Sequence, residues 1–389
     1  MSVKTIQTIP FNRPCIAQNE LKYLTEALNG GSTSGDGPFT HRASRLLEGA
    51  TGANRALLTT SCTHALEMAA LLLDLRPGDE VIMPSFTFVS TANAFALRGA
   101  VPVFVDCRPD TLNLDERLVE AAVTERTKAI VVVHYAGVAC EMDAIGEVAR
   151  RHGLTVIEDN AHGLGGSYKG RPLGSFGRMA TQSFHATKNI QCGEGGALIL
   201  NDPELVVRAE VIREKGTNRS QFFRGQVDKY RWVDIGSSYL PSDLLAAQLT
   251  AQLESFDAIQ ARRHAVWNAY HGGLADWAAA NEVSQPVVPD ECAHPAHLYY
   301  LLLPDLANRQ ALIAHLAERG VQATFHYQSL HAAPAGVRYG RPGPAGCPVT
   351  EQMADRLVRL PLFADLSESD TARVLEAVRA YSCRVPQST

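Results

Sequence analysis

Residues Ser183–Ala197, with the sequence SFHATKNIQCGEGGA, form a polar stretch between two segments that we interpret as short strands. These flanking segments are residues 179–184 and residues 197–200. The stretch contains one lysine, Lys188, and three glycines. A lysine amine forms imines with carbonyl compounds when its pKa is lowered and its position is fixed, and glycines let the backbone approach a bulky group. The pattern therefore predicts a lysine-based site beside a sheet.

A strand that ends in carboxylates lies upstream, at residues 154–163 (LTVIEDNAHG). Most lysines are solvated surface residues, so Lys188 alone indicates little. A buried strand ending in a carboxylate, here Asp159, is what the pyridinium nitrogen of pyridoxal 5′-phosphate (PLP) requires opposite its ring. Together the two stretches predict a PLP site.

The overall composition is that of an ordinary globular protein. The chain has 389 residues, 46% of them apolar, and a formal net charge of −5. The length suits two domains, and the charge gives no electrostatic basis for binding nucleic acid. Residues 1–10 lack the apolar core of a signal peptide, and no apolar run reaches the length of a membrane helix. Its eight cysteines show no C-x-x-C spacing. We therefore expect a cytoplasmic protein with no membrane partner.

Residues 55–202 alternate short apolar runs with helix-like segments, a pattern typical of an α/β fold with a mainly parallel sheet. The runs predict a seven-stranded sheet. The predicted strands are residues 56–59, 80–83, 101–106, 129–134, 154–158, 179–184 and 197–200. The helices predicted between them are residues 63–75, 88–97, 115–122 and 141–152.

The C-terminal part predicts a second, smaller α+β domain. Helices at residues 242–259 and 262–275 are expected to cross from the large domain, residues 1–255, to the small one, residues 256–389. The small domain is predicted to contain strands at residues 298–303 and 322–326 and helices at residues 309–319, 351–358 and 367–381. The segment Gly30–Gly37 fits a flexible connector or a ligand-binding loop, and residues 338–348 predict a surface loop.

Two junctions between a strand and a helix carry candidate cofactor-binding groups. At Thr60–Leu66 (TSCTHAL), the free backbone N–H groups of a helix start would bind an anion, although Ser and Thr there also serve as simple caps. At Pro84–Thr91 (PSFTFVST), Phe88 would stack on a flat ring or belong to the core.

The glycines of Gly163–Gly166 (GLGG) correspond only in part to a dinucleotide-binding loop. Tyr168 occupies the place of the third glycine in G-x-G-x-x-G, and no helix is predicted after it. This pattern disfavours an NAD-dependent oxidoreductase.

Several histidines and a basic segment allow more than one interpretation. His294, His297, His326 and His331 lack an H-E-x-x-H motif or a carboxylate partner, so we expect no metal and favour structural or substrate-binding roles. Residues 215–232 are basic and aromatic, which suits a solvated surface or the diphosphate of a nucleotide sugar.

These motifs together resemble the DegT/DnrJ/StrS family of sugar aminotransferases, which are PLP-dependent enzymes of fold type I. The resemblance covers nearly the whole chain. It rests on Thr59–Leu66, Pro84–Thr91, Glu158–Gly163, Ser183–Ala197, Gly236–Ala247, His297–Tyr299 and His326–His331. Residues Val133–Asp143, Gly216–Gly225 and Asp234–Leu240 are similar to members that aminate C4 of a dTDP-linked keto sugar.

The resemblance implies roles for the residues around the cofactor ring. Lys188 would hold PLP as a Schiff base and then move a proton at the reacting carbon. Asp159 would pair with the pyridinium nitrogen, and Phe88 would stack on the ring. His162 stands where the family usually has glutamine, and it would contact the ring oxygen or the sugar.

The resemblance also implies a phosphate site shared between subunits. The backbone of Cys62 and Thr63, with the side chain of Ser183, would hold the phosphate. Most members are homodimers whose partner chain adds a phosphate contact from the position of Ser238, where asparagine is common. We therefore expect a homodimer or a higher oligomer.

The implied reaction passes an amino group from L-glutamate, through the cofactor, to a dTDP-4-keto-6-deoxy sugar. The residues expected to bind this sugar nucleotide are Arg219, Arg231, His326, Tyr327 and His331. Some members carry histidine in place of the lysine and are dehydratases, so Lys188 favours transamination. A 3-keto sugar aminotransferase, a non-catalytic regulator with the same fold and an NAD-dependent sugar oxidoreductase are the alternatives. The stereochemistry at C4 stays open.

Overall fold

The computed structural model describes residues 7–31 and 33–383. Among these residues, eight strands form a central sheet in the order β1-β9-β8-β5-β4-β2-β3-β12. The strands are β1 (Arg55–Thr59), β2 (Glu80–Pro84), β3 (Val101–Val105), β4 (Thr127–Val133), β5 (Thr155–Asp159), β8 (Met179–Ser183), β9 (Gly196–Leu200) and β12 (Arg341–Pro342). All neighbours from β8 to β12 run parallel, and β9 is antiparallel to both β1 and β8.

All seven predicted strands are present, and among the described residues the central sheet has one strand more than predicted. The additional strand, β12, comes from the segment expected to be a surface loop and pairs in parallel with β3. Arg341 holds it there, because its Nη2 lies 2.9 Å from an oxygen of the buried Glu80. The C-terminal part of the chain therefore returns to the large sheet.

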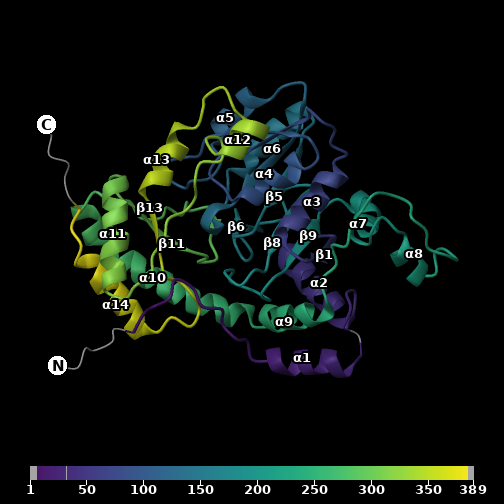
Figure 1. The fold of residues 1–389 in the computed structure, drawn as a ribbon, viewed down its shortest axis with the longest axis horizontal. Helices are drawn as coiled ribbons and strands as arrows, with labels where there is room; N and C mark the ends of the chain where they lie inside the picture. Colours follow the sequence, from purple (N-terminus) through teal and green to yellow (C-terminus); the bar gives the residue numbers. More distant parts are fainter. Residues whose placement is uncertain (1–6, 32, 384–389) are drawn as a thin grey trace.

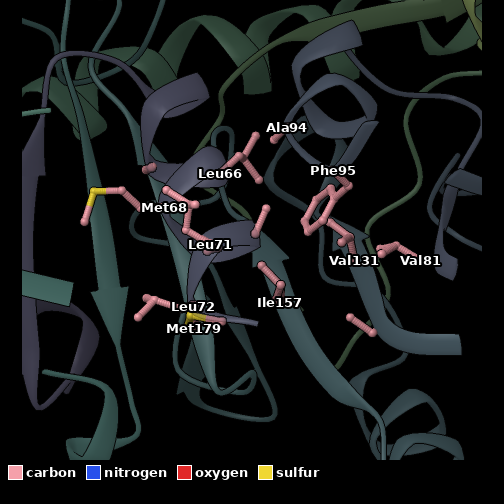
Figure 2. Close-up of a cluster of buried hydrophobic side chains, with 14 of the residues drawn as sticks. Leu66, Met68, Leu71, Leu72, Val81, Ala94, Phe95, Val131, Ile157 and Met179 are labelled. Atoms are coloured by element: carbon pink, nitrogen blue, oxygen red, sulfur yellow. The ribbon is translucent and has the colours of Figure 1, made fainter. Parts of the chain in front are cut away.

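Alternating side chains give the sheet two buried faces. In β4, Ala129 and Val131 belong to one apolar cluster, whereas Ile130 and Val132 belong to another. The first cluster includes α3 (Cys62–Leu72) and α4 (Val89–Ala96), whose Leu66 and Phe95 lie over the sheet in Figure 2. The second includes α6 (Met142–His152), and α5 (Glu116–Val119) contributes Val119 to it. Helices on both faces are what a parallel sheet requires.

Two helices occupy the N-terminal region, where the sequence indicated only a loop. These are α1 (Glu20–Asn29) and α2 (Pro38–Thr51), on either side of the Gly- and Ser-rich segment. Asp243 fixes the start of α2: its buried carboxylate accepts hydrogen bonds from the backbone N–H and the hydroxyl of Thr40, both at 2.7 Å. Asp243 begins α9 (Asp243–Glu254), so α2 and α9 are joined at their ends.

The remaining elements are the C-terminal helices and strands, the short strands β6, β7 and β10, and helices α7 and α8. The long helix α10 (Phe256–Ala280) follows α9 after Ser255, which is the position of the predicted domain boundary. In Figure 1, α10, α11 and α14 gather at the end of the molecule opposite α7 and α8. The bounds of these elements are α7 (Val206–Arg213), α8 (Arg219–Phe223), α10 as given, α11 (Leu306–Glu318), α12 (Pro334–Tyr339), α13 (Pro348–Arg356), α14 (Glu368–Arg379), β6 (Ser167–Tyr168), β7 (Arg171–Pro172), β10 (Cys292–Ala293), β11 (Tyr299–Leu302) and β13 (Leu357–Leu360).

One predicted strand of the small domain is wrong. Residues 322–326 are not a strand, and only Thr324 makes an isolated bridge, to Arg359 of β13. The pairing of β11 with β13 supplies the sheet of this domain. No helix in the described part of the chain is long and apolar enough to cross a membrane.

Candidate active site

A cavity of about 610 Å³ lies at the carboxyl ends of the parallel strands, where open α/β sheets bind their ligands. Its walls come from both domains. Asp159 and Ser183 stand at the ends of β5 and β8, and Lys188 lies in the loop after β8. Tyr327 and Arg359 come from the C-terminal domain. Groups far apart in the sequence thus face one cavity.

The loop that carries Lys188 is compact and anchored. The Ala186 N–H donates to the carbonyl of Gly193 at 2.9 Å, and Gly193 has a positive φ of 77° that glycine adopts without strain. The next side chain, Asn189, is buried, donates to the carbonyl of Pro295 at 2.7 Å and lies 2.8 Å from Nδ1 of His297. These bonds tie the loop to the small domain and fix the position of Lys188.

The pKa of Lys188 predicts how the apoprotein takes up PLP. Burial lowers this pKa from 10.5 to about 8. The neutral amine attacks an aldehyde and the protonated amine does not. We therefore expect the rate of PLP uptake to rise with pH through about 8 and then to level off. Stopped-flow absorbance after mixing apoprotein with PLP measures this rate, and a rise that continues to the ordinary lysine pKa would contradict the prediction.

The two neighbouring carboxylates at the end of β5 have different surroundings. Glu158 is fully buried and accepts backbone hydrogen bonds from Gly174, Phe176 and Gly177, at 2.7, 2.6 and 2.7 Å. Its second oxygen also lies 2.9 Å from Nε2 of His134. Glu158 therefore stabilises the turn at residues 174–177. It is not one of the described residues that line the cavity.

Asp159, in contrast, faces the cavity and is only 5% exposed. The hydroxyl of Thr91 donates to its Oδ2 at 2.7 Å, and the N–H of Ala161 donates to Oδ1 at 3.3 Å. Burial raises the pKa of Asp159, while these hydrogen bonds and the charge of Lys188 lower it. A cation placed against this carboxylate would hold it in the ionised form.

The start of α3 offers a site for an anion. Ser61 caps the helix, since its Oγ accepts from the N–H of His64 at 3.1 Å, and the first backbone N–H groups of any helix have no acceptor within the helix. Cys62, Thr63 and Ser183 all line the cavity here. A Cβ on Gly196 would overlap the backbone of Ser61 and Cys62, so glycine allows β9 to approach this helix start.

Histidine and aromatic side chains form another part of the cavity wall. The rings of His162 and His297 stack at 4.2 Å, and Tyr135 Oη lies 3.0 Å from Nδ1 of His326. Burial lowers the pKa of all three histidines well below the usual value, so they are neutral. Nδ1 of His162 has no hydrogen-bond partner among the described residues. This wall therefore offers uncharged donors and acceptors.

Phe88 and Tyr327 also line the cavity, with ring centroids 6.3 Å apart. Phe88, which directly precedes α4, is 56% exposed. An aromatic side chain left open to a cavity is available to cover a flat ligand.

Four predicted site residues lie outside this cavity. His331 is held by Ser85, 2.7 Å from its Nδ1, and by Glu351, 3.0 Å from its Nε2. The other three, Ser238, Arg219 and Arg231, are exposed on the segment that contains α8, away from the cavity lining. The site within one chain therefore lacks them.

Some cavity residues were not predicted. The pair Phe11 and Asn12 of the N-terminal segment was missed. Thr91, which lies behind the wall and donates a hydrogen bond to Asp159, was missed as well. Arg359 was also missed, although a lone arginine inside the apolar run of β13 was a usable signal. The described residues contain no group of three or more histidine, cysteine or acidic side chains suited to a metal ion.

These observations fit PLP. A buried carboxylate, an exposed aromatic ring, an anion-binding helix start and a lysine of lowered pKa surround one cavity of suitable size. With a mainly parallel sheet and a smaller C-terminal part, they indicate a PLP-dependent enzyme of fold type I.

The chain belongs to the DegT/DnrJ/EryC1/StrS aminotransferase family, whose profile matches residues 14–379. It is therefore a PLP-dependent aminotransferase.

Solved structures support this assignment. The aminotransferase TlmJ from Streptoalloteichus hindustanus is 32% identical, with a TM-score of 0.87 over 96% of this chain and 98% of that chain. DesV from S. venezuelae is 31% identical, with a TM-score of 0.85 over 96% and 100%. The PLP form of a putative sugar aminotransferase, Spr1654 from Streptococcus pneumoniae, is 27% identical, with a TM-score of 0.88 over 96% and 98%.

Proposed function

We propose that the enzyme transfers the amino group of L-glutamate to C4 of dTDP-4-keto-6-deoxy-D-glucose. The product is a dTDP-4-amino-4,6-dideoxyhexose for glycan or natural-product biosynthesis. The observation that carries the proposal is the shared cavity of Lys188 and Asp159, whose other wall is neutral and suited to a sugar. The likeness to Spr1654, described as a putative sugar aminotransferase, and the sequence likeness at residues 216–225 and 234–240 support the same substrate class.

Each residue around the cofactor would have a separate role. PLP, when bound, supplies an electron-withdrawing ring that weakens the bonds at the amino-bearing carbon. Asp159 would hold a negative charge against the ring nitrogen, and Phe88 would cover the ring. The N–H groups of Cys62 and Thr63 would bind the phosphate. Lys188, freed by the incoming amine, would take a proton from the reacting carbon and return one to the cofactor side.

The neutral wall suits a hexose. Sugar hydroxyls both donate and accept hydrogen bonds, and their C–H faces pack on aromatic rings. The cavity residues His162, His326 and Tyr327 offer both kinds of contact. Burial keeps the two histidines neutral, so the sugar hydroxyls meet no charge there. We assign these three residues to the sugar.

The exposed segment around α8 is proposed to serve a partner subunit. It carries Trp232, which is 79% exposed, with Phe223 and Tyr230, an apolar group that water solvates poorly. Arg219 and Arg231 lie on the same segment and outside their own cavity. In a homodimer this segment would reach the other subunit, where its arginines would bind the sugar diphosphate and Ser238 the cofactor phosphate.

Hybrid dimers test this arrangement. We expect Arg231→Ala to raise KM for the nucleotide sugar and to leave the L-glutamate half-reaction nearly unchanged. Mixing and refolding this variant with inactive Lys188→Ala should restore part of the activity, because one hybrid site then has both residues. The matched control replaces Lys188→Ala in this mixture by the double variant Lys188→Ala/Arg231→Ala. It should restore no activity, because no hybrid site then has both residues. A monomer by light scattering, or no restoration, would contradict the shared site.

The substrate is tested by the product. Purified enzyme incubated with ¹⁵N-labelled L-glutamate and dTDP-4-keto-6-deoxy-D-glucose should give a sugar nucleotide with ¹⁵N on C4, detected by NMR, which also reads the configuration at that carbon. A parallel incubation contains a 3-keto sugar nucleotide instead. Label on C3 of that sugar, with no label on C4 of the 4-keto sugar, would show that the enzyme is a 3-keto sugar aminotransferase.

A further inference from the structure

A cluster of histidine and tryptophan rings lies outside the cavity and surrounds His294. His264, Trp267 and His271 all belong to α10. The ring of His294 lies 4.4 Å from that of Trp267 and 5.2 Å from that of His264, measured between centroids. His271 stacks on the same tryptophan at 4.7 Å. These four side chains are not among the described residues that line the cavity, so they have no direct contact with a ligand there.

The ring of His294 holds a backbone turn formed by residues 294–297, which we name the anchor turn. Nδ1 of His294 accepts a hydrogen bond from the N–H of Ala296 at 3.2 Å. Ala296 has a φ of 49°, in the left-handed region where any residue with a β-carbon is strained. A strained backbone conformation persists only where the surrounding structure fixes it. The bond to His294 therefore helps to keep the anchor turn in its observed shape.

The anchor turn is bonded to the Lys188 loop, the segment that joins β8 to β9. The carbonyl of Pro295 accepts hydrogen bonds from the side-chain amides of Asn189 at 2.7 Å and Gln260 at 3.0 Å. Oδ1 of Asn189 lies 2.8 Å from Nδ1 of His297. Asn189 directly follows Lys188 in the chain. A change in the anchor turn thus reaches the residue next to the lysine.

The surroundings of His294 favour its neutral form. Burial, with smaller contributions from the charges of His264 and His271, lowers the pKa of His294 from 6.5 to about 4. The other titratable groups packed against the cluster are the cation Arg263 on α10 and Tyr299 on β11, whose pKa burial raises. In the described part of the chain no carboxylate acts on His294. A proton on this ring would therefore meet apolar or cationic neighbours.

We propose that His294 is a positioning residue for the Lys188 loop and that its protonation in mild acid releases this loop. The proton occupies Nδ1, so the ring can no longer accept from the N–H of Ala296. A partly buried cation without a carboxylate partner also moves toward solvent. The anchor turn then relaxes from its strained shape, and Pro295 no longer holds the amide of Asn189. The fold thus contains an acid-sensitive catch beside the proposed cofactor lysine.

Hydrogen exchange of the holoenzyme, measured by mass spectrometry at pH 7.5 and pH 5, tests this catch. An opening that exposes His294 restores its ordinary pKa of 6.5, so acid should raise the opening constant about 30-fold between these pH values. After correction for intrinsic exchange rates, residues 183–197 and 292–298 should both lose protection by this factor. Residues 127–133 of β4 should keep their protection.

His294→Asn is the decisive comparison, because its Oδ1 can accept from the N–H two residues on and does not titrate. Its two segments should be as protected as the wild type at pH 7.5 and should stay protected at pH 5. His294→Leu, which has no acceptor, should be less protected at both pH values. His315→Gln is the matched control, since His315 lies 2.9 Å from the carbonyl of Ala377 on α14 and outside the cluster. It should respond to acid as the wild type does.

The rate of PLP release, read from absorbance, gives the consequence for the cofactor. It should rise more in the wild type than in His294→Asn when the pH is lowered from 7.5 to 5. This part rests on the proposed role of Lys188, whereas the exchange response does not depend on turnover or substrate, so the two can fail separately. Equal responses to acid in the wild type and His294→Asn would overturn the proposal. Loosening of residues 292–298 without residues 183–197 would overturn it as well.

Discussion

Replacing Lys188 by alanine is expected to abolish transamination and to leave the fold intact. The amine is the group that holds PLP and moves the proton, so turnover should fall by more than about 1,000-fold. The side chain of Lys188 donates no hydrogen bond to the described residues, and burial lowers its pKa to about 8, so removing it leaves no buried partner unpaired. Steady-state assays, with circular dichroism and thermal unfolding as checks of folding, measure both expectations.

Lys169→Ala is the matched control for Lys188→Ala. Lys169 is an exposed lysine in the turn between β6 and β7, where it pairs with Asp143. Its removal should change neither turnover nor PLP content. A Lys188→Ala enzyme that transaminates near the wild-type rate would disprove the assignment, and an unfolded variant would show that the side chain also supports the structure.

Replacing Asp159 by asparagine is expected to preserve PLP binding and to lower kcat by about 100-fold or more. An amide keeps an acceptor for the Ala161 N–H, and its NH₂ can donate to Thr91, whose hydroxyl can turn toward Thr87 at 2.9 Å. The amide carries no negative charge, so the cofactor nitrogen would lose the partner that keeps it protonated. PLP content from the absorbance spectrum, and kcat from the coupled reaction, separate the two effects.

The adjacent carboxylate serves as the control. Glu158→Gln changes the same group one residue away, where it accepts three backbone hydrogen bonds outside the cavity. We expect it to lower the unfolding temperature and to spare kcat of the folded fraction. If Asp159→Asn keeps wild-type kinetics while Glu158→Gln loses catalysis, the roles of the two residues are reversed.

The large sheet was predictable because its strands are short apolar runs buried on both faces. β12 was not, because a two-residue strand of arginine and proline carries no such pattern and exists through the edge of β3 and the pairing of Arg341 with Glu80. The false strand at residues 322–326 shows the converse, since that segment forms a bridge to a neighbouring strand only at Thr324. Helices α1 and α2 were not predicted, because the glycines between them indicated a loop.

The cavity was predictable where its residues follow strands or begin helices. Lys188, Asp159, Phe88 and the start of α3 all occupy such junctions, and the structure brings them together. Arg359 and Phe11 depend on how the small domain and the N-terminal segment meet the large sheet, which no local pattern encodes. The residues on the α8 segment face away from their own cavity, so their roles stay predictions that a dimer would have to complete.

The covalent attachment of PLP tests the central claim most directly. Reducing the holoenzyme with sodium borohydride fixes the cofactor to the amine that holds it, and mass spectrometry of the resulting peptides locates the modification. The account predicts a phosphopyridoxyl group on Lys188 alone. Modification of a different lysine, or holoenzyme that carries PLP with no lysine modified, would contradict it.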